Sequence, residues 1–222
     1  MPVEITWLGH SCFRLRDRAA TVVTDPYGKG LGPILPRVRA DIVTISHDAD
    51  DHNNVRGVKG DFQVLTGPGE YEVSSVFVTG LELRGERKGK KGAEAAPRNT
   101  VFLFEFDDLT VCHLGDLNHV PTQAQVEEAL GTVDVLLIPV GGGESLNASQ
   151  ASEVVSLLEP HIVIPMHYKV PGIDLNLDPV NKFLKEMGLD KVAPQESLKV
   201  SRGGLPDETQ VVVLELKSKD EA

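Results

Sequence analysis

The stretch Ser46-His-Asp-Ala-Asp-Asp-His52 decides how the rest of the chain is interpreted. It completes the apolar run at 41–46, which predicts a buried strand. Two imidazoles and three carboxylates lie within these seven residues, and such closely spaced like charges repel unless a cation or several donors compensate them. Imidazole and carboxylate together are the ligands of zinc, manganese and iron. The stretch therefore favours a metal site over its alternative, an acidic turn whose solvated side chains cap a short helix.

Apolar β-like runs end at a potential metal ligand in five places along the chain. The residues at these ends are His10, Asp25, His47, Asp116 and His167. In α/β proteins, sites form outside the carboxyl ends of strands, where loops converge on a rigid sheet. We therefore expect these five residues at one shared edge.

The order of the elements predicts two sheets packed together with helices outside. Helices are expected over 122–130, 148–158 and 179–187, the last with Asp178 as its N-cap and Gly188 just past its end. No sharp linker or repeat divides the sequence, so residues 1–222 are expected to form a single domain. Strands are expected over 3–8, 13–16, 21–24, 41–46, 62–66, 76–79, 100–106, 109–114, 133–140, 162–166, 197–201 and 210–216.

The stretch at 46–52 resembles the HxHxDH signature of the metallo-β-lactamase superfamily. His47 matches the first histidine, Asp51 the aspartate and His52 the last histidine, while Ala49 stands where the second histidine belongs. The similarity extends over the whole chain. The opening Trp7-Leu-Gly-His-Ser-Cys-Phe13 and the pair Asp25-Pro26 resemble the branch that contains ascorbate-6-phosphate lactonase and many uncharacterised hydrolases. The resemblance implies an α/β fold, the four-layer αββα sandwich, with metals at one edge between the sheets.

The resemblance also implies which residues bind metal. Members with two metals build one site mainly on three histidines, but this chain has Ala49 at one of them and no histidine between His52 and His113. The ligands implied for the other site are all present: Asp51, His52, Asp116 and His167. We therefore expect one divalent metal per chain on these four residues, zinc by preference and manganese or iron as alternatives, with His47 nearby. His10 either replaces a missing histidine in a second site or has a structural role.

A metal-dependent hydrolase is the function that this resemblance implies. A bound divalent metal lowers the pKa of its water from near 16 to about 7, and the resulting hydroxide would attack a small, anionic ester, lactone or phosphoester. Asp51 or Asp116 would act in catalysis, by orienting the water or accepting its proton. The alternative is a catalytically degenerate module of the same fold that binds a metal or ligand without turnover.

Two further residues are candidates for substrate binding. His119 lies in the loop after Asp116, and Glu70 lies in a glycine-flanked segment that either turns the carboxylate toward the site or exposes it on a tight turn. The basic stretch at 84–98 is either a solvated loop or a lid that recruits an anionic substrate.

Composition limits the classes of partner. A net charge of −11 argues against broad nucleic-acid binding, and no apolar run approaches the ~20 residues of a membrane span. The opening residues lack the pattern of a secretory signal, so a cytoplasmic location is expected. The expected partner is a small-molecule substrate, and a homo-oligomer is possible. Cys12 and Cys112 lie in apolar segments and are expected to be buried hydrophobes.

Overall fold

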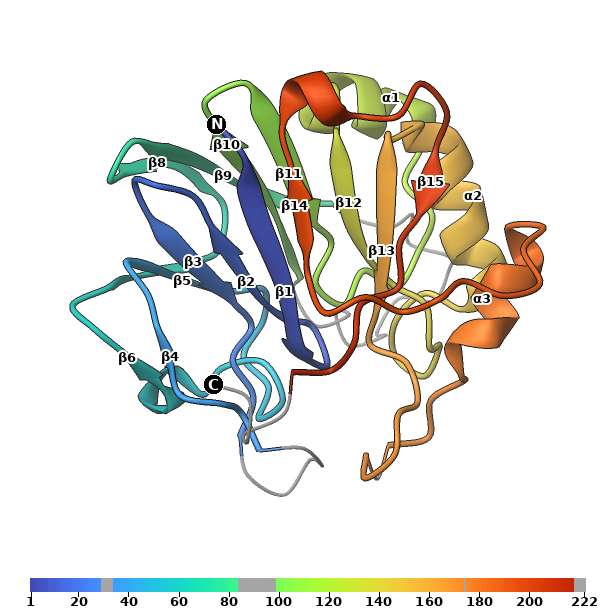
Figure 1. Cartoon of the computed structure of the whole chain (residues 1–222), viewed down its shortest axis with the longest axis horizontal. Coiled ribbons are helices and arrows are strands. Elements are labelled where there is room, and N and C mark those ends of the chain that lie inside the picture. The colour runs from blue at the N-terminus through green and yellow to red at the C-terminus, as the bar shows by residue number, and fades with distance from the viewer. Residues whose placement is uncertain (29–33, 84–98, 174, 218–222) are drawn as a thin grey trace, which may run out of the picture.

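The computed structural model describes residues 1–28, 34–83, 99–173 and 175–217. Two β-sheets pack face to face, and the helices lie outside the sheet that contains β12 and β13 (Figure 1). The basic stretch at 84–98 lies outside the described residues.

The six-stranded sheet contains most of the N-terminal strands. Strands β1, β2 and β3 form an antiparallel meander, and β5 and β7 then run parallel to β3. Parallel pairing brings the carboxyl ends of β3, β5 and β7 to one edge of the sheet. In spatial order the strands are β14 (Leu198–Val200), β1 (Val3–Gly9), β2 (Cys12–Arg16), β3 (Thr21–Thr24), β5 (Ile42–Ile45) and β7 (Gln63–Thr66).

The seven-stranded sheet combines an antiparallel half with a parallel half. Strands β8 to β11 pair antiparallel, and β11, β12, β13 and β15 pair parallel. A hairpin turn at Asp107 and Asp108 joins β10 to β11. In spatial order the strands are β15 (Gln210–Val211), β13 (Ile162–Met166), β12 (Val135–Pro139), β11 (Leu109–His113), β10 (Thr100–Phe106), β9 (Val76–Glu82) and β8 (Gly69–Val73).

Apolar residues from both sheets form one large core between them. Ile5 and Trp7 of β1 and Phe102 and Phe104 of β10 all belong to this cluster. Every residue of β12 and β13 is buried, as expected for parallel strands covered on both faces. Helix α2 (Ala148–Leu158) covers this sheet with buried residues at helical spacing: Ala148, Ala151, Val154, Val155 and Leu158.

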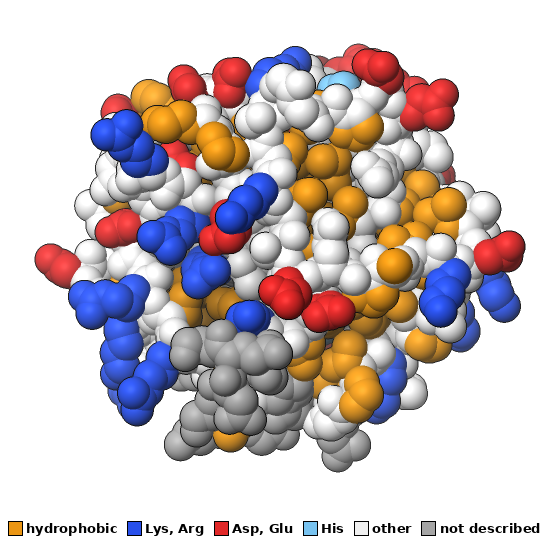
Figure 2. Space-filling model, in the orientation of Figure 1, with side chains coloured by type: hydrophobic (Ala, Val, Ile, Leu, Met, Phe, Trp, Pro, Cys, Tyr) orange, Lys and Arg blue, Asp and Glu red, His pale blue; other side chains and the backbone are white. Residues whose placement is uncertain are grey.

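A smaller apolar cluster lies on the other side of the six-stranded sheet. It packs Val23 and Val43 of that sheet against a two-stranded ribbon, β4 (Val38–Arg39) and β6 (Val58–Lys59). A single 3₁₀ turn, η1 (Val55–Gly57), precedes β6. Figure 2 shows that Lys and Arg side chains gather on this side of the molecule, although the chain as a whole is acidic.

Several elements differ from their sequence-based predictions at the ends. The helix expected over 122–130 begins as α1 (Gln123–Gln125) with a Thr122 capping box and widens into a π-helical turn, Val126–Leu130. The N-cap of α3 (Val180–Glu186) is Pro179, not Asp178, and the Asp178 carboxylate instead forms an ion pair with the Lys182 ammonium at 2.6 Å. Among the described residues, no helix has the length and apolar character needed to cross a membrane.

Candidate metal centre

Five side chains from the ends of three strands converge between the two sheets. His47, Asp51 and His52 follow β5 of the six-stranded sheet, whereas Asp116 follows β11 and His167 follows β13 of the seven-stranded sheet. Their ligand atoms form two groups, each within 4.8 Å: His47, His52 and Asp116, and Asp51, His52 and His167. His52 belongs to both groups, so the five residues form one continuous cluster.

The distances between nitrogen and oxygen atoms within the cluster run from 3.0 to 4.0 Å, short enough for the atoms to surround a cation. His52 Nε2 lies 3.3 Å from Asp116 Oδ1, and His52 Nδ1 lies 3.0 Å from Asp51 Oδ1. His167 Nε2 lies 3.9 Å from Asp51 Oδ2, and His47 Nε2 lies 4.0 Å from Asp116 Oδ2. The nitrogen and oxygen atoms thus face one another across a small volume.

Three buried atoms of this cluster have no hydrogen-bond partner. They are His52 Nδ1, Asp116 Oδ1 and His167 Nε2. A buried polar atom without a partner costs free energy, so such atoms are rare in folded proteins. Each of the three is a type of atom that binds divalent transition metals. The residues therefore fit a divalent metal ion.

The electrostatics of the cluster favour charged side chains even without a metal. Burial alone would raise the pKa of Asp51, but the neighbouring His167 and His52 rings outweigh it and hold the pKa well below its usual value. Burial would also raise the pKa of Asp116, but the neighbouring charges of His167 and His52 lower it by more, so its pKa is lowered as well. Burial alone would lower the pKa of His52. The Asp116 carboxylate raises it by more than burial lowers it, so the pKa lies well above the ordinary value.

His47 is oriented by the buried pair Asp25 and Ser46, and the sequence had indicated Asp25 as one of the strand-end residues. Asp25 is fully buried and accepts hydrogen bonds from Ser46 N at 2.7 Å and Ser46 Oγ at 2.6 Å. Since the Ser46 hydroxyl donates its one proton to Asp25, it accepts from His47 Nδ1, 3.0 Å away. His47 Nε2 then carries the lone pair that faces Asp116.

Asn99 holds the loop that carries Asp116. Its amide donates to Leu114 O at 2.9 Å and accepts from Asp116 N at 2.8 Å. Gly115 makes this approach possible, because a Cβ on Gly115 would lie 2.4 Å from Asn99 Oδ1 and 2.5 Å from Ser46 Cβ. Sequence reasoning missed Asn99, whose only signal was its position immediately before a predicted strand.

His113 is separate from the cluster and is fully used in hydrogen bonds. Its Nε2 donates to Ser11 O at 2.8 Å, and its Nδ1 accepts from Gly115 N at 3.2 Å. Burial lowers its pKa, which keeps the ring neutral. His113 therefore has a structural role, and its nitrogens are not available to the cluster.

The remaining predicted site residues lie outside both metal-capable groups. His10 is buried, with its ring 4.9 Å from the Tyr27 ring and 6.2 Å from the His167 ring. His119 is half-buried, and its Nδ1 lies 3.1 Å from Asn118 Oδ1. Glu70 is exposed on β8, an edge strand, opposite Thr79. The segment around Glu70 is therefore a strand, not the tight turn that its glycines suggested.

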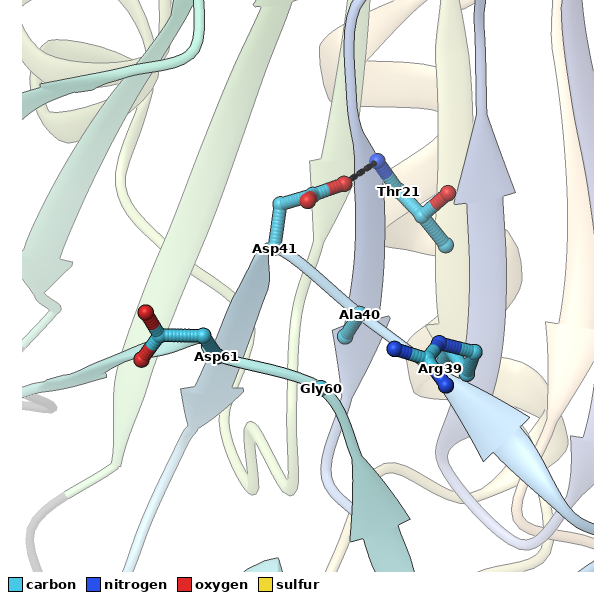
Figure 3. Close-up of a pocket in the computed structure, with 6 residues that line it drawn as sticks. All are labelled: Thr21, Arg39, Ala40, Asp41, Gly60 and Asp61. Atoms are coloured by element: carbon cyan, nitrogen blue, oxygen red, sulfur yellow. Dashed lines mark hydrogen bonds between the residues drawn. The ribbon is translucent and has the colours of Figure 1, made fainter.

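A polar hollow at the opposite end of β3 and β5 is distinct from the cluster. It is lined by Thr21, Arg39, Ala40, Asp41, Gly60 and Asp61 (Figure 3). Thr21 opens β3 and Asp41 precedes β5, whereas the cluster follows the carboxyl end of β5. The Asp41 carboxylate accepts a hydrogen bond from Thr21 N at 2.8 Å, so this hollow belongs to the connection between strands.

Comparison with known proteins gives consistent matches along most of the chain. Residues 4–167 match the family model described as the beta-lactamase superfamily domain. A solved structure from Thermotoga maritima, of a protein in the metallo-beta-lactamase superfamily, is 42% identical, covers 96% of this chain and 98% of its own, and has a TM-score of 0.76. A UPF0173 protein of Pyrococcus furiosus is 28% identical over 83% of this chain and 90% of its own length. A UPF0173 metal-dependent hydrolase of Thermococcus kodakarensis is 24% identical over 75% of this chain and 84% of its own length.

Proposed function

Because this chain belongs to the metallo-beta-lactamase superfamily, we propose that it is a metal-dependent hydrolase of a small, anionic ester, lactone or phosphoester. The expected α/β fold of that superfamily is confirmed. Relatives of similar length that are named metal-dependent hydrolases support the reaction class.

The observation that carries the proposal is the convergence of imidazole and carboxylate groups from both sheets, three of whose buried atoms lack a hydrogen-bond partner. Asp51, His52, Asp116 and His167 would hold one divalent metal, zinc by preference, with His47 beside them. We infer one metal because Ala49 stands where a histidine of the other site belongs, and the sequence has no histidine between His52 and His113. When bound, such a metal lowers the pKa of a water molecule and polarises a carbonyl or phosphoryl oxygen.

The two carboxylates have different surroundings and therefore different roles. The side chain of Asp51 is 21% exposed and that of Asp116 is 13% exposed, so Asp51 is the more accessible to a proton in transit. Both carboxyl groups have lowered pKa values and are ionised at neutral pH. We propose that Asp51 accepts and releases the proton of the attacking water, while Asp116, whose backbone Asn99 holds, keeps His52 and His47 in position.

Metal content and hydrolysis, measured on the same preparations, test this function. Protein purified without added metal should contain about one transition metal per chain by elemental mass spectrometry, and the Asp51→Ala and His167→Ala variants should contain far less. The wild-type protein should hydrolyse at least one member of a panel of lactones, carboxylic esters and phosphodiesters, and the variants should not. Absence of metal, with stability unchanged on adding zinc or manganese, would refute the proposal.

Two other outcomes of that experiment would point to a second metal site or to a protein without catalytic activity. Close to two metals per chain would mean that His10 and His47 rebuild a second site. One metal without turnover of any substrate would support the second candidate, a module that binds metal or ligand. Ala49 favours this candidate, because an alanine replaces a histidine of the superfamily signature.

A further inference from the structure

Ser145 lies in the loop between β12 and α2, at the side of His167. It is buried, and its backbone N–H and its hydroxyl both donate to Gly142 O, at 3.3 Å and 3.0 Å. Its Oγ also lies 3.3 Å from His167 Nδ1. The serine therefore connects the loop to a proposed metal ligand.

The direction of these hydrogen bonds follows from what each group can do. A carbonyl oxygen only accepts, so the single hydroxyl proton of Ser145 is directed at Gly142 O. The remaining capacity of Oγ is that of an acceptor, and His167 Nδ1 must then carry the proton between them. In a neutral imidazole, a proton on Nδ1 leaves the lone pair on Nε2.

We propose that Ser145 is a positioning residue that selects the Nδ1–H tautomer of His167 and so presents the Nε2 lone pair to the metal. That Nε2 atom is buried without a hydrogen-bond partner and lies 3.9 Å from Asp51 Oδ2. Hydrogen bonds to the second ring nitrogen fix the tautomer and orientation of metal-binding histidines. The inference rests on the proposed function, in which His167 is a ligand.

The backbone around Ser145 is built to keep this geometry. A Cβ on Gly141 would lie 2.2 Å from His167 O, so only glycine allows the loop to approach His167 this closely. His167 itself has a positive φ of 50°, and its N–H donates to His10 O at 3.2 Å. The glycine run at 141–143 thus packs the loop against His167, and the hydroxyl completes the contact.

If Ser145 only stabilised the turn, its substitution would leave the His167 tautomer unchanged. The first experiment therefore measures that tautomer directly. Long-range ¹H–¹⁵N correlation spectra of the metal-free protein at about pH 8, above the ordinary histidine pKa, report which ring nitrogen carries the proton. The His167→Gln variant assigns the His167 signals. We expect the Nδ1–H form in the wild type, a shift toward Nε2–H in Ser145→Ala, and recovery in Ser145→Thr, which keeps the hydroxyl.

An Nε2–H form of His167 in the wild-type protein would overturn the proposal, as would an unchanged Nδ1–H form in Ser145→Ala. Because the protein carries no metal in this measurement, the result does not depend on whether the proposed hydrolase activity exists. If Ser145→Ala fails to fold, comparison of wild type with Ser145→Thr and Ser145→Cys still tests whether the acceptor sets the tautomer.

The second experiment measures zinc affinity by competition with a chromophoric chelator. We expect Ser145→Ala to bind zinc about 10- to 100-fold more weakly, as is typical when a partner of a ligand histidine is lost, and Ser145→Thr to bind nearly as the wild type does. Ser156→Ala is the matched control, because this exposed serine makes a similar hydroxyl-to-carbonyl bond, to Ser152 O at 3.0 Å, within helix α2. Equal affinity of Ser145→Ala and Ser156→Ala would refute the positioning role.

Discussion

Asp25 is a single buried carboxylate on which the geometry of the acidic histidine turn depends. Both of its oxygens accept hydrogen bonds from Ser46, at 2.7 Å and 2.6 Å. The Asp25→Asn variant places an amide N–H₂ against one of these donors. We expect a loss of about 2 kcal/mol in the free energy of unfolding, measured by urea denaturation of the metal-free protein, because hydrogen bonds to charged groups contribute about 1.5–3 kcal/mol.

Asp41→Asn is the control for this substitution. Asp41 also accepts a backbone N–H at the edge of the same sheet, from Thr21 at 2.8 Å, but it is exposed and water can replace the bond. We expect a loss below about 1 kcal/mol. Equal effects of the two substitutions would contradict the importance assigned to burial at Asp25.

His113 gives a pH dependence whose sign follows from its burial. Burial lowers its pKa in the folded protein below the ordinary value near 6.5. Between these two pKa values the unfolded chain binds more protons than the folded chain, so stability falls as the pH decreases through this window. The contribution is limited to about 1.4 kcal/mol per pH unit. Urea denaturation of metal-free protein between about pH 7 and pH 5 should show a smaller decline in the free energy of unfolding for His113→Gln than for wild type. An equal decline in the two proteins would show that His113 does not titrate in this way.

The residues of the metal-capable cluster stand out in the sequence, whereas Asn99 and Ser145, which contact the Asp116 backbone and the His167 ring, do not. His47, Asp51 and His52 stand out because their types are unusual in one short turn after an apolar strand. Asn99 and Ser145 are residue types that are common in loops, and they act across 17 and 22 residues of sequence. Such contacts exist only once the strands are assembled, so no local pattern records them.

Helix α2 offers a test at the scale of an element. Its C-cap is Glu159, which has a left-handed backbone with φ of 45°, a conformation that costs non-glycine residues about 1–2 kcal/mol. We expect Glu159→Gly to raise the free energy of unfolding by about 0.5–1 kcal/mol, since part of the gain is offset by the greater freedom of glycine in the unfolded chain. Glu153→Gly, on an exposed position inside the same helix, should instead lower it by about 1 kcal/mol. Thermal or urea denaturation measures both, and a loss of stability in Glu159→Gly would contradict the expectation.

Strands that are buried along their whole length were predictable from the sequence. Strands of only two residues were not. The runs at β12 and β13 are apolar throughout, because both of their faces are covered, and they were recognised. The ribbon β4–β6 has only two residues per strand and gives no periodicity. Strand β8 was obscured by Gly67 and Gly69, which predict a turn; both have positive φ, and Gly69 opens the strand.

The arrangement of the whole molecule was predictable from one rule and one resemblance. Carboxyl ends of parallel strands meet at one edge within each sheet. The packing of the two sheets then brings the end of β5 close to the ends of β11 and β13. His10 also ends a strand but stays outside the metal-capable groups, where its ring contacts Tyr27 and its carbonyl accepts from Trp7 Nε1. The rule therefore identifies the edge, and side-chain packing decides which residues at that edge can share a ligand.

A metal in this cluster would join the two sheets, and this leads to a prediction about global stability. Asp51 and His52 follow the six-stranded sheet, whereas Asp116 and His167 follow the seven-stranded sheet, so unfolding of either sheet would destroy the site. Metal at about 100 times its dissociation constant should then add about 2.7 kcal/mol to the free energy of unfolding, and chelation should remove it.

The comparison of variants from the two sheets completes this test. Asp51→Ala removes a ligand from one sheet and Asp116→Ala from the other, and each variant should lose most of the metal-dependent increase in melting temperature. Asp41→Asn, at the opposite end of β5, should retain the full increase. If only one of these two variants lost the metal-dependent increase in melting temperature, the metal would bind to one sheet alone. We expect both to lose it, because His52 lies between the two carboxylates, 3.0 Å from Asp51 and 3.3 Å from Asp116.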